Sequence, residues 1–169
     1  IVREFCEDNN GNLWIGTRQG VYILDADDQF HKLSEWMPGA ELEFLHSRIF
    51  DIKEDAERNI WIATNYEGIV RINLQDKTYK RYAVGQKRDV QNIFCLLVDS
   101  HQQIWAGSMW NGLSYYDRRQ DMFVTITSFS TIENKGITNI VEDSRGKIWI
   151  TTNNTVLSFT MNEAHVLEN

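Results

Sequence analysis

The sequence predicts an all-β protein made of β-propeller blades, each a sheet of four antiparallel strands. An Asp is followed six residues later by a Trp four times along the chain. These pairs are Asp8 and Trp14, Asp55 and Trp61, Asp99 and Trp105, and Asp143 and Trp149. Successive Trp residues are 47, 44 and 44 residues apart, and a strand-rich repeat of this length is typical of a propeller. We expect about four blades in an arc of a larger propeller, with a closed four-blade ring as the alternative.

The composition is that of a soluble globular segment. The chain has 169 residues, of which 42% are hydrophobic and 24% are charged. A net charge of −7 argues against nucleic acid and against an anionic membrane surface as partners. No apolar run reaches the roughly 18 residues of a membrane span, so we expect no membrane contact by this segment. Cys6 and Cys95 fall in different repeats, which predicts two separate buried thiols and no disulfide.

Each repeat begins with an inner strand that carries two apolar residues spaced three apart. These pairs are Val2 and Phe5, Ile49 and Ile52, Ile93 and Leu96, and Ile137 and Ile140. The Asp that follows is expected to start a tight turn, because its carboxylate can accept a hydrogen bond from the N–H two residues further on. A Gly in such a turn supplies the positive φ that the turn requires.

The second strand of each repeat contains the Trp and, two residues later, a small residue on the same face. The small residues are Gly16, Ala63, Gly107 and Thr151. We interpret them as space kept for the neighbouring sheet. The third strand follows Gly20, Gly68 and Gly112, with Thr155 at the fourth copy, and the fourth strand carries Phe30 and Leu33, Tyr79 and Tyr82, Phe123 and Ile126, and Val166.

These elements divide a single propeller segment, residues 1–169, into four units. The approximate repeats are 1–33, 49–82, 93–126 and 137–169. A helix is expected only at Ala40 to His46, in the insert after the first repeat. If the chain is an arc, both of its ends expose apolar sheet faces that another segment or chain should cover.

The repeated pattern I-x-x-I-x-E-D-x-x-G-x-I/L-W-I-G-T-x-x-G-V/L resembles the regulator-propeller repeat of two-component signalling proteins. The first repeat is nearest to it, with Glu7-Asp8, Gly11, Leu13 to Thr17 and Gly20-Val21. The fourth follows, with Ile137, Ile140, Glu142-Asp143, Gly146 and Ile148 to Ile150. The departures are a missing turn Gly in the second and third repeats, Val98 in place of Glu, and Thr155 in place of Gly.

The resemblance implies the sensor region of a hybrid histidine kinase, on the periplasmic side of a bacterial inner membrane. It implies further propeller blades, a membrane helix and a kinase outside this chain, and it allows a homodimer. This segment would then bind a ligand without catalysing a reaction. It would need no cofactor.

Function on a propeller is expected on loops held by the rigid blades. The loops between the second and third strands, and the connections 34–48, 83–92 and 127–136, should open on one face. They also depart most from the repeat pattern. We therefore predict an oligosaccharide site there, since an exposed aromatic ring can pack on a sugar and neighbouring amides or carboxylates can bond its hydroxyls. The candidate residues are Arg18, Asn65, Tyr66, Glu67, Trp110, Asn111, Asn153 and Asn154.

Plainer interpretations stand beside this one. Tyr66 and Trp110 could each pack over their own blade. Trp36, with Glu35, His46 and Arg48, could form a rim, but simple packing of the insert is the preferred interpretation. The turn at Asp8 looks like a calcium loop, yet its copies at Asp55 and Asp99 lack the several oxygen ligands that calcium needs, so we expect structural turns and no metal.

Two other functional classes remain open. One is a protein–protein interaction scaffold. The other is a propeller enzyme, sialidase-like or lyase-like. The sialidase Asp box has its Gly two residues after the Asp, whereas Gly11 and Gly146 come three residues after theirs. No cluster of His and carboxylates that could act as acid and base can be placed from the sequence.

Overall fold

The structure, a computed structural model, describes residues 1–37, 46–85, 92–127, 135–161 and 167–168. These residues form four sheets, each of four strands in the order in which they follow along the chain. All the pairings between neighbouring strands are antiparallel. The predicted all-β class and the four-stranded blades are confirmed.

The strands of the first sheet are β1 (Val2–Glu7), β2 (Leu13–Thr17), β3 (Gly20–Leu24) and β4 (Phe30–Lys32). The second sheet contains β5 (Ile49–Glu54), β6 (Asn59–Thr64), β7 (Ile69–Asn73) and β8 (Thr78–Tyr82). The third contains β9 (Ile93–Val98), β10 (Ile104–Ser108), β11 (Leu113–Asp117) and β12 (Met122–Thr125). The fourth contains β13 (Ile137–Glu142), β14 (Ile148–Thr152), β15 (Val156–Met161) and β16 (Leu167–Glu168).

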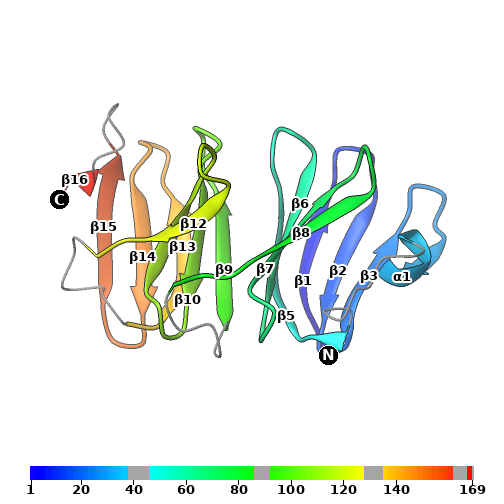
Figure 1. Ribbon diagram of the computed structural model, residues 1–169, viewed down its shortest axis with the longest axis horizontal. Coiled ribbons are helices and arrows are strands. Elements are labelled where there is room, and N and C mark those ends of the chain that lie inside the picture. Colours follow the sequence, from blue (N-terminus) through cyan, green and yellow to red (C-terminus); the bar gives the residue numbers. More distant parts are fainter. Residues whose placement is uncertain (38–45, 86–91, 128–134, 162–166, 169) are drawn as a thin grey trace.

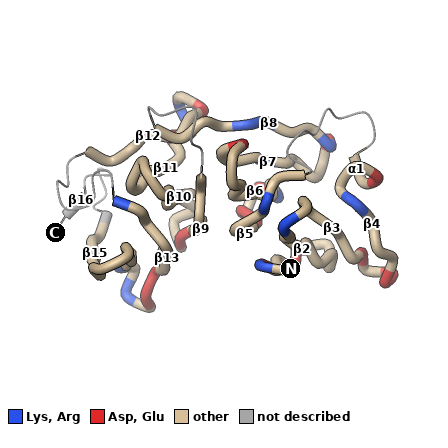
Figure 2. Tube along the Cα trace, turned by 90° about the horizontal axis from the view of Figure 1, so that it is seen from below, with Lys and Arg blue, Asp and Glu red and all other residues tan. Residues whose placement is uncertain are grey.

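The four sheets stand side by side in a curved row (Figures 1 and 2). The first strands of consecutive sheets contact one another, β1 with β5, β5 with β9, and β9 with β13. The first and fourth sheets lie at opposite ends of the row (Figure 1). The described residues therefore form an open arc of four blades, as expected from the sequence.

The fourth strand of the first sheet is shorter than predicted. It ends at Lys32, and Leu33 begins the short helix α1 (Leu33–Trp36). Leu33 is fully buried in the first core layer, so it reaches the core from the helix and not from a strand. The predicted helix from Ala40 to His46 falls almost entirely outside the described residues, and so does Val166.

The hydrophobic core consists of three layers, one between each pair of neighbouring sheets. The layer between the first two sheets joins Trp14 and Ile23 to Ile49, Ile52 and Ile62. The other two layers repeat this arrangement around Trp61 and around Trp105. A single sheet thus has no core of its own, and its stability depends on its neighbours.

We call the first strands of the four sheets, β1, β5, β9 and β13, the inner strands. Each contains an irregularity in its pairing register, at Arg3, Phe50, Phe94 and Thr138. This bulge explains why apolar residues three apart share one face. In a regular strand, residues three apart point to opposite faces. One extra residue at a bulge between them turns both side chains to the same face. Ile49 and Ile52 consequently pack into the same layer.

The glycines two residues after Trp14 and Trp105 make room for the next sheet, as predicted. A Cβ atom added at Gly16 would lie 2.9 Å from Cγ2 of Ile49. At Gly107 it would lie 2.6 Å from Cγ2 of Ile137 and 2.5 Å from Sγ of Cys95. These distances are too short for carbon atoms, so the first and second sheets, and the third and fourth, approach this closely only because the side chain is absent.

The six-residue spacing of Asp and Trp, which is the same in all four repeats, has a direct cause in the structure. The indole Nε1 of each Trp donates a hydrogen bond to the Asp six residues earlier, at 2.9, 2.7, 2.9 and 3.0 Å along the chain. The other carboxylate oxygen accepts from the backbone N–H groups two and four residues after the Asp. The turns are structural, and Arg58 and Gln102 adopt the positive φ that Gly11 and Gly146 supply elsewhere.

The two cysteines differ in environment. Cys95 is buried, as predicted, and burial raises the pKa of its thiol to about 12. Cys6 is only half-buried and packs against the edge of the core layer between the first two sheets. Both are free thiols.

Candidate ligand-binding face

The loops between the second and third strands of the sheets lie beside the starts of the inner strands. The backbone N–H of Arg18 donates to the carbonyl of Ile1 at 3.2 Å. In the next two sheets the N–H groups of Asn65 and Met109 donate to the carbonyls of Arg48 and Asn92, each at 3.0 Å. We call this edge, with loop residues 18–19, 65–67, 109–111 and 153–154, the loop face. The opposite edge, with the Asp turns, is the turn face.

The two aromatic candidates are exposed on the loop face. Tyr66 is 65% exposed and Trp110 is 46% exposed, and they occupy equivalent positions in the second and third sheets. Neither ring is stacked on another ring of the described residues. Both rings can be reached from this face, and about half of the Trp110 side chain is covered.

The remaining candidates divide into two groups. Arg18, Asn153 and Asn154 are exposed, and Asn65 is half-buried. Glu67 is also half-buried, and its carboxylate pairs with the guanidinium of Arg81.

Asn111 is placed differently from our expectation of a residue exposed to a ligand. It is 7% exposed, and its side-chain amide donates to the carbonyl of Val84 at 3.0 Å. The Asn111 backbone N–H donates to Oγ of Ser108 at 2.7 Å. The side chain thus ties the loop of the third sheet to the connection that leaves the second sheet.

The bulge residues of the inner strands were not recognised as candidates from the sequence. The guanidinium of Arg3 lies 5.1 Å from the ring centre of Phe50, and that ring meets Phe94 edge-on at 4.9 Å. The three side chains form a continuous row on the inner strands, next to the loop face. The signal that could have revealed them is the three-residue spacing of the apolar pairs, since it requires one extra residue between them.

A charged cluster links the inner strands of three sheets. Nζ of Lys53 binds the carboxylates of Asp51 and, at 3.2 Å, Glu4. Asp51 also accepts the backbone N–H of Leu96 at 2.7 Å. Burial raises the pKa of Asp51, although Lys53 opposes this shift. All these groups are engaged in bonds between blades, so the cluster is best explained as a structural tie.

A second polar cluster joins the outer strands of the second and third sheets. The carboxylate of Asp121 accepts the hydroxyl groups of Tyr82 and Tyr116 at 2.7 and 2.6 Å. Burial raises the pKa of both tyrosines. Lys80 also pairs with Asp121. This cluster has the arrangement of a structural contact, since both hydroxyl groups donate to the same carboxylate.

The described start of the insert after the first sheet packs against the blade, and residues 38–45 lie outside the described residues. The ring of Trp36 meets His31 edge-on at 5.3 Å and is half-buried against the first core layer. Glu35 accepts the backbone N–H of Lys32 at the start of α1. His46 lies at the rim of a pocket of ≈ 530 Å³ that also involves Tyr22 and Lys32.

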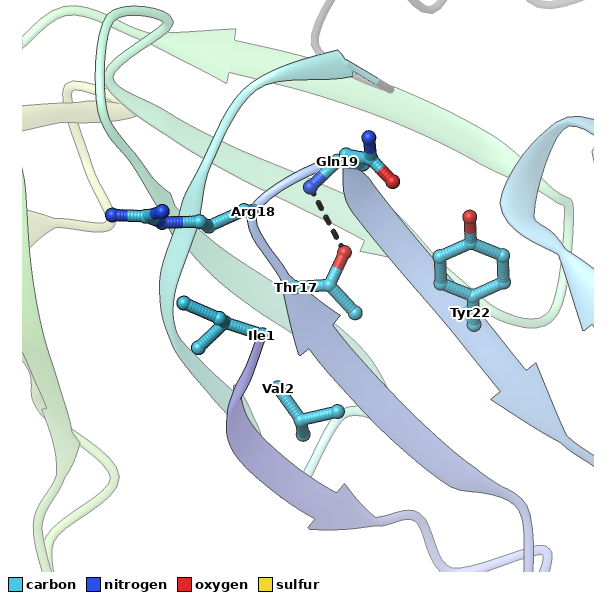
Figure 3. A pocket seen from close by; sticks show the side chains of 6 residues that line it. All are labelled: Ile1, Val2, Thr17, Arg18, Gln19 and Tyr22. Carbon is cyan, nitrogen blue, oxygen red and sulfur yellow. Dashed lines mark hydrogen bonds between the residues drawn. The ribbon is translucent and has the colours of Figure 1, made fainter.

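A second pocket, of ≈ 330 Å³, lies at the exposed end of the first sheet (Figure 3). It is lined by Ile1, Val2, Thr17, Arg18, Gln19 and Tyr22. Gln19 donates its backbone N–H to Oγ1 of Thr17 at 3.0 Å. The side chain of Arg18 extends away from Tyr22 (Figure 3).

In the described parts of the chain, no group of three or more His, Cys, Asp or Glu residues is arranged to hold a metal ion. Within the same residues, no helix is both long enough and apolar enough to cross a bilayer.

Comparison with known families finds one match. The family described as two component regulator propeller matches residues 1–19, 43–66 and 131–154. Comparison with curated proteins finds no significant match. The matched stretches cover the first, second and fourth Asp turns, each with its Trp.

Several solved structures share the fold. The extracellular domain of the hybrid two component system BT4673 from B. thetaiotaomicron is 20% identical, with a TM-score of 0.74, over 99% of this chain and 22% of that one. The corresponding domain of BT3049 from the same organism is 15% identical, with a TM-score of 0.64, over 99% and 29%. Virginiamycin B lyase from Staphylococcus aureus is 13% identical, with a TM-score of 0.74, over 99% and 54%. At these identities the likeness establishes the propeller fold alone, and the chain spans only part of each relative.

Proposed function

We propose that this chain, which carries repeats of the two-component regulator propeller family, is a ligand-binding segment of a sensor and lies on the extracytoplasmic side of the membrane. The similarity to extracellular domains of two hybrid two-component systems supports this proposal. The ligand that we propose is an oligosaccharide. It binds on the loop face without being chemically changed.

The observation that carries the proposal is the pair of exposed rings at equivalent positions in adjacent blades. Tyr66 and Trp110 are exposed, whereas Trp61, Trp105 and Tyr116 of the same two sheets are buried. A ring on the surface presents a flat apolar face to the C–H groups of a sugar. Asn65 beside Tyr66 supplies an amide for the hydroxyl groups.

Signal transmission follows from the architecture. The blades are rigid because their cores are shared, so a ligand that contacts two blades acts on their arrangement as a unit. A ligand shifts an equilibrium between two arrangements only by the difference in its affinity for them. Contacts to Tyr66 and Trp110 would therefore favour one arrangement of the propeller relative to its neighbouring domains.

The lyase-like alternative has weaker support. A lyase shares the fold at 13% identity, which does not extend to its chemistry. Catalysis requires a convergent set of acid, base or metal groups in an accessible place. The two clusters of titratable groups described above bond between blades, and neither lies on the loop face.

The test is calorimetric titration with a panel of neutral and acidic oligosaccharides. We expect Tyr66→Ala and Trp110→Ala each to weaken the binding of a responding sugar by up to about tenfold, since stacking on a ring contributes on the order of 0.5–1.5 kcal/mol. Their free energies of unfolding should change by less than about 0.5 kcal/mol, because both residues are exposed. Met122→Ala is the matched control, since Met122 is 47% exposed on the outer strand β12.

Three results would contradict the proposal. One is the absence of binding by any oligosaccharide in the panel. The second is normal binding by both aromatic variants. The third is loss of cooperative unfolding in those variants, which would make both rings part of the scaffold.

A further inference from the structure

The two faces of each sheet have fixed partners in this structure. We call the face with the apolar pair of the inner strand the leading face, and the face with the Trp the trailing face. In the second, third and fourth sheets the leading face packs on the trailing face of the sheet before it. The first residues of their apolar pairs, Ile49, Ile93 and Ile137, are all 0% exposed.

The leading face of the first sheet has the same apolar character but lies open. Val2 is 50% exposed and Phe5 is 57% exposed, although their counterparts Ile49 and Ile52 are fully buried. Phe30, 60% exposed, stacks on Tyr22 with ring centres 5.6 Å apart. The pocket of Figure 3 belongs to this face, because Val2 and Tyr22 line it.

A second feature of the blade contacts lies on the turn face. The residue after each Asp of the first three sheets donates its backbone N–H to a side chain of the next sheet. Asn9 donates to Glu54 at 2.8 Å, and Ser100 donates to Glu142 at 2.7 Å. Each acceptor is the Glu that comes directly before the Asp of the next repeat. Between the second and third sheets, where Val98 replaces this Glu, Gln102 accepts the N–H of Ala56 at 2.8 Å.

Glu7 occupies the corresponding position in the first sheet. It comes directly before Asp8 and is exposed. Its carboxylate forms no hydrogen bond or ion pair with the described residues. The first sheet therefore carries both halves of a blade contact, an apolar face and a carboxylate acceptor, and both lack a partner here.

We propose that the leading face of the first sheet docks a further propeller blade of the same repeat type. That blade has Gly or Ala two residues after its Trp, and the N–H after its Asp donates to Glu7. This docking would continue the series of three blade contacts within the structure. The chain also spans only 22% and 29% of two extracellular domains that share its fold.

A second copy of this chain does not fit as the docked blade. Its free trailing face is that of the fourth sheet, which has Thr151 at the position of Gly16 and Gly107. A single Cβ atom at Gly16 or Gly107 would already lie within 2.9 Å of the facing Ile. Thr adds two further heavy atoms, so it holds the two sheets apart.

The docking can be tested with the chain itself. The probe is the double variant Phe5→Asp/Thr151→Gly, whose trailing face is opened and whose leading face is blocked. In sedimentation velocity, the wild-type chain alone and the probe alone should each be monomeric. An equimolar mixture should sediment as a 1:1 complex, with the leading face of the wild type on the trailing face of the probe.

Three comparisons make the result specific. Glu7→Ala in the wild-type partner should weaken the complex several-fold, because the carboxylate acceptor is lost. Phe5→Asp in that partner should abolish it. Met122→Asp, an equal change of charge on an exposed residue of the outer strand β12, should leave it intact.

The proposal fails if the mixture stays monomeric while both proteins unfold cooperatively on heating. It also fails if the wild-type chain alone associates in a manner that Phe5→Asp abolishes, since Thr151 would then not exclude a second copy. A complex that is insensitive to Phe5→Asp in the wild-type partner would place the contact elsewhere and overturn the assignment.

Discussion

The second and fourth sheets have the same turn but different surroundings. In both, the Asp accepts the indole N–H of the Trp, at 2.7 Å for Asp55 and 3.0 Å for Asp143. In both, it also accepts the N–H groups two and four residues further on. Trp61 is nevertheless fully buried, whereas Trp149 is only half-buried.

The difference comes from the next sheet. Trp61 packs against Tyr116 and Phe123 of the third sheet, with ring centres 4.9 and 5.9 Å apart. The same face of the fourth sheet carries Val141 and Val156, which are 51% and 62% exposed. The comparison shows that the turn forms from local sequence, while the depth of burial depends on a neighbouring blade.

The largest expected effect is that of Asp55→Ala. It would leave the buried indole N–H of Trp61 and the N–H and amide of Asn59 without an acceptor. Each buried unsatisfied group costs about 1–3 kcal/mol, so we expect a loss of about 3–5 kcal/mol in the free energy of unfolding, measured by urea denaturation. Asp143→Ala should cost clearly less, because water can replace the carboxylate there. Equal losses would show that burial by the next sheet does not matter.

The next effect concerns the space between sheets. Gly107→Val should lose about 1–3 kcal/mol, since its side chain would overlap Ile137 and Cys95 of the adjoining strands. Thr151→Val, at the equivalent position of the fourth sheet, should change the free energy of unfolding by less than about 0.5 kcal/mol. The same urea experiment distinguishes the two. A large loss with Thr151→Val would mean that the trailing face of the fourth sheet is packed.

The smallest effect is in the pH dependence. The indole of Trp149, with the N–H groups of Arg145 and Lys147, lowers the pKa of Asp143 to about 2 from its ordinary value of 3.8. Because the folded-state pKa is depressed, the stabilisation is complete above about pH 4 and is lost as the pH falls towards 2. Asp143→Asn should therefore flatten the dependence of unfolding stability on pH between 4 and 2. An unchanged profile would show that this carboxylate does not contribute.

Much of the fold was predictable from particular residues. The Asp and Trp spacing, the small residue after the Trp and the apolar pair identified the turn, the second strand and the inner strand of each blade. The indole bond to the carboxylate was not foreseen, although the constant six-residue step was its signature. The inner-strand bulges were not predicted, although a three-residue spacing of apolar residues does not fit the two-residue period of a regular strand.

The candidate site was less predictable. The exposure of Tyr66 and Trp110 agreed with their place in variable loops. Asn111, in the same loop as Trp110, proved to be buried and bonded to Val84. The neighbouring connection from the second sheet covers it, and no pattern within the loop indicates that contact.

The sequence by itself determined the repeat, the four Asp turns and the alternation of faces along each strand. These features depend on hydrogen bonds and side-chain directions within about six residues, which chemistry close along the chain dictates. Only the tertiary structure decided which copies of the motif are buried and which loop residues are free. Both depend on which sheet stands alongside, through contacts between residues far apart in the sequence, such as Asn9 with Glu54 and Asn111 with Val84.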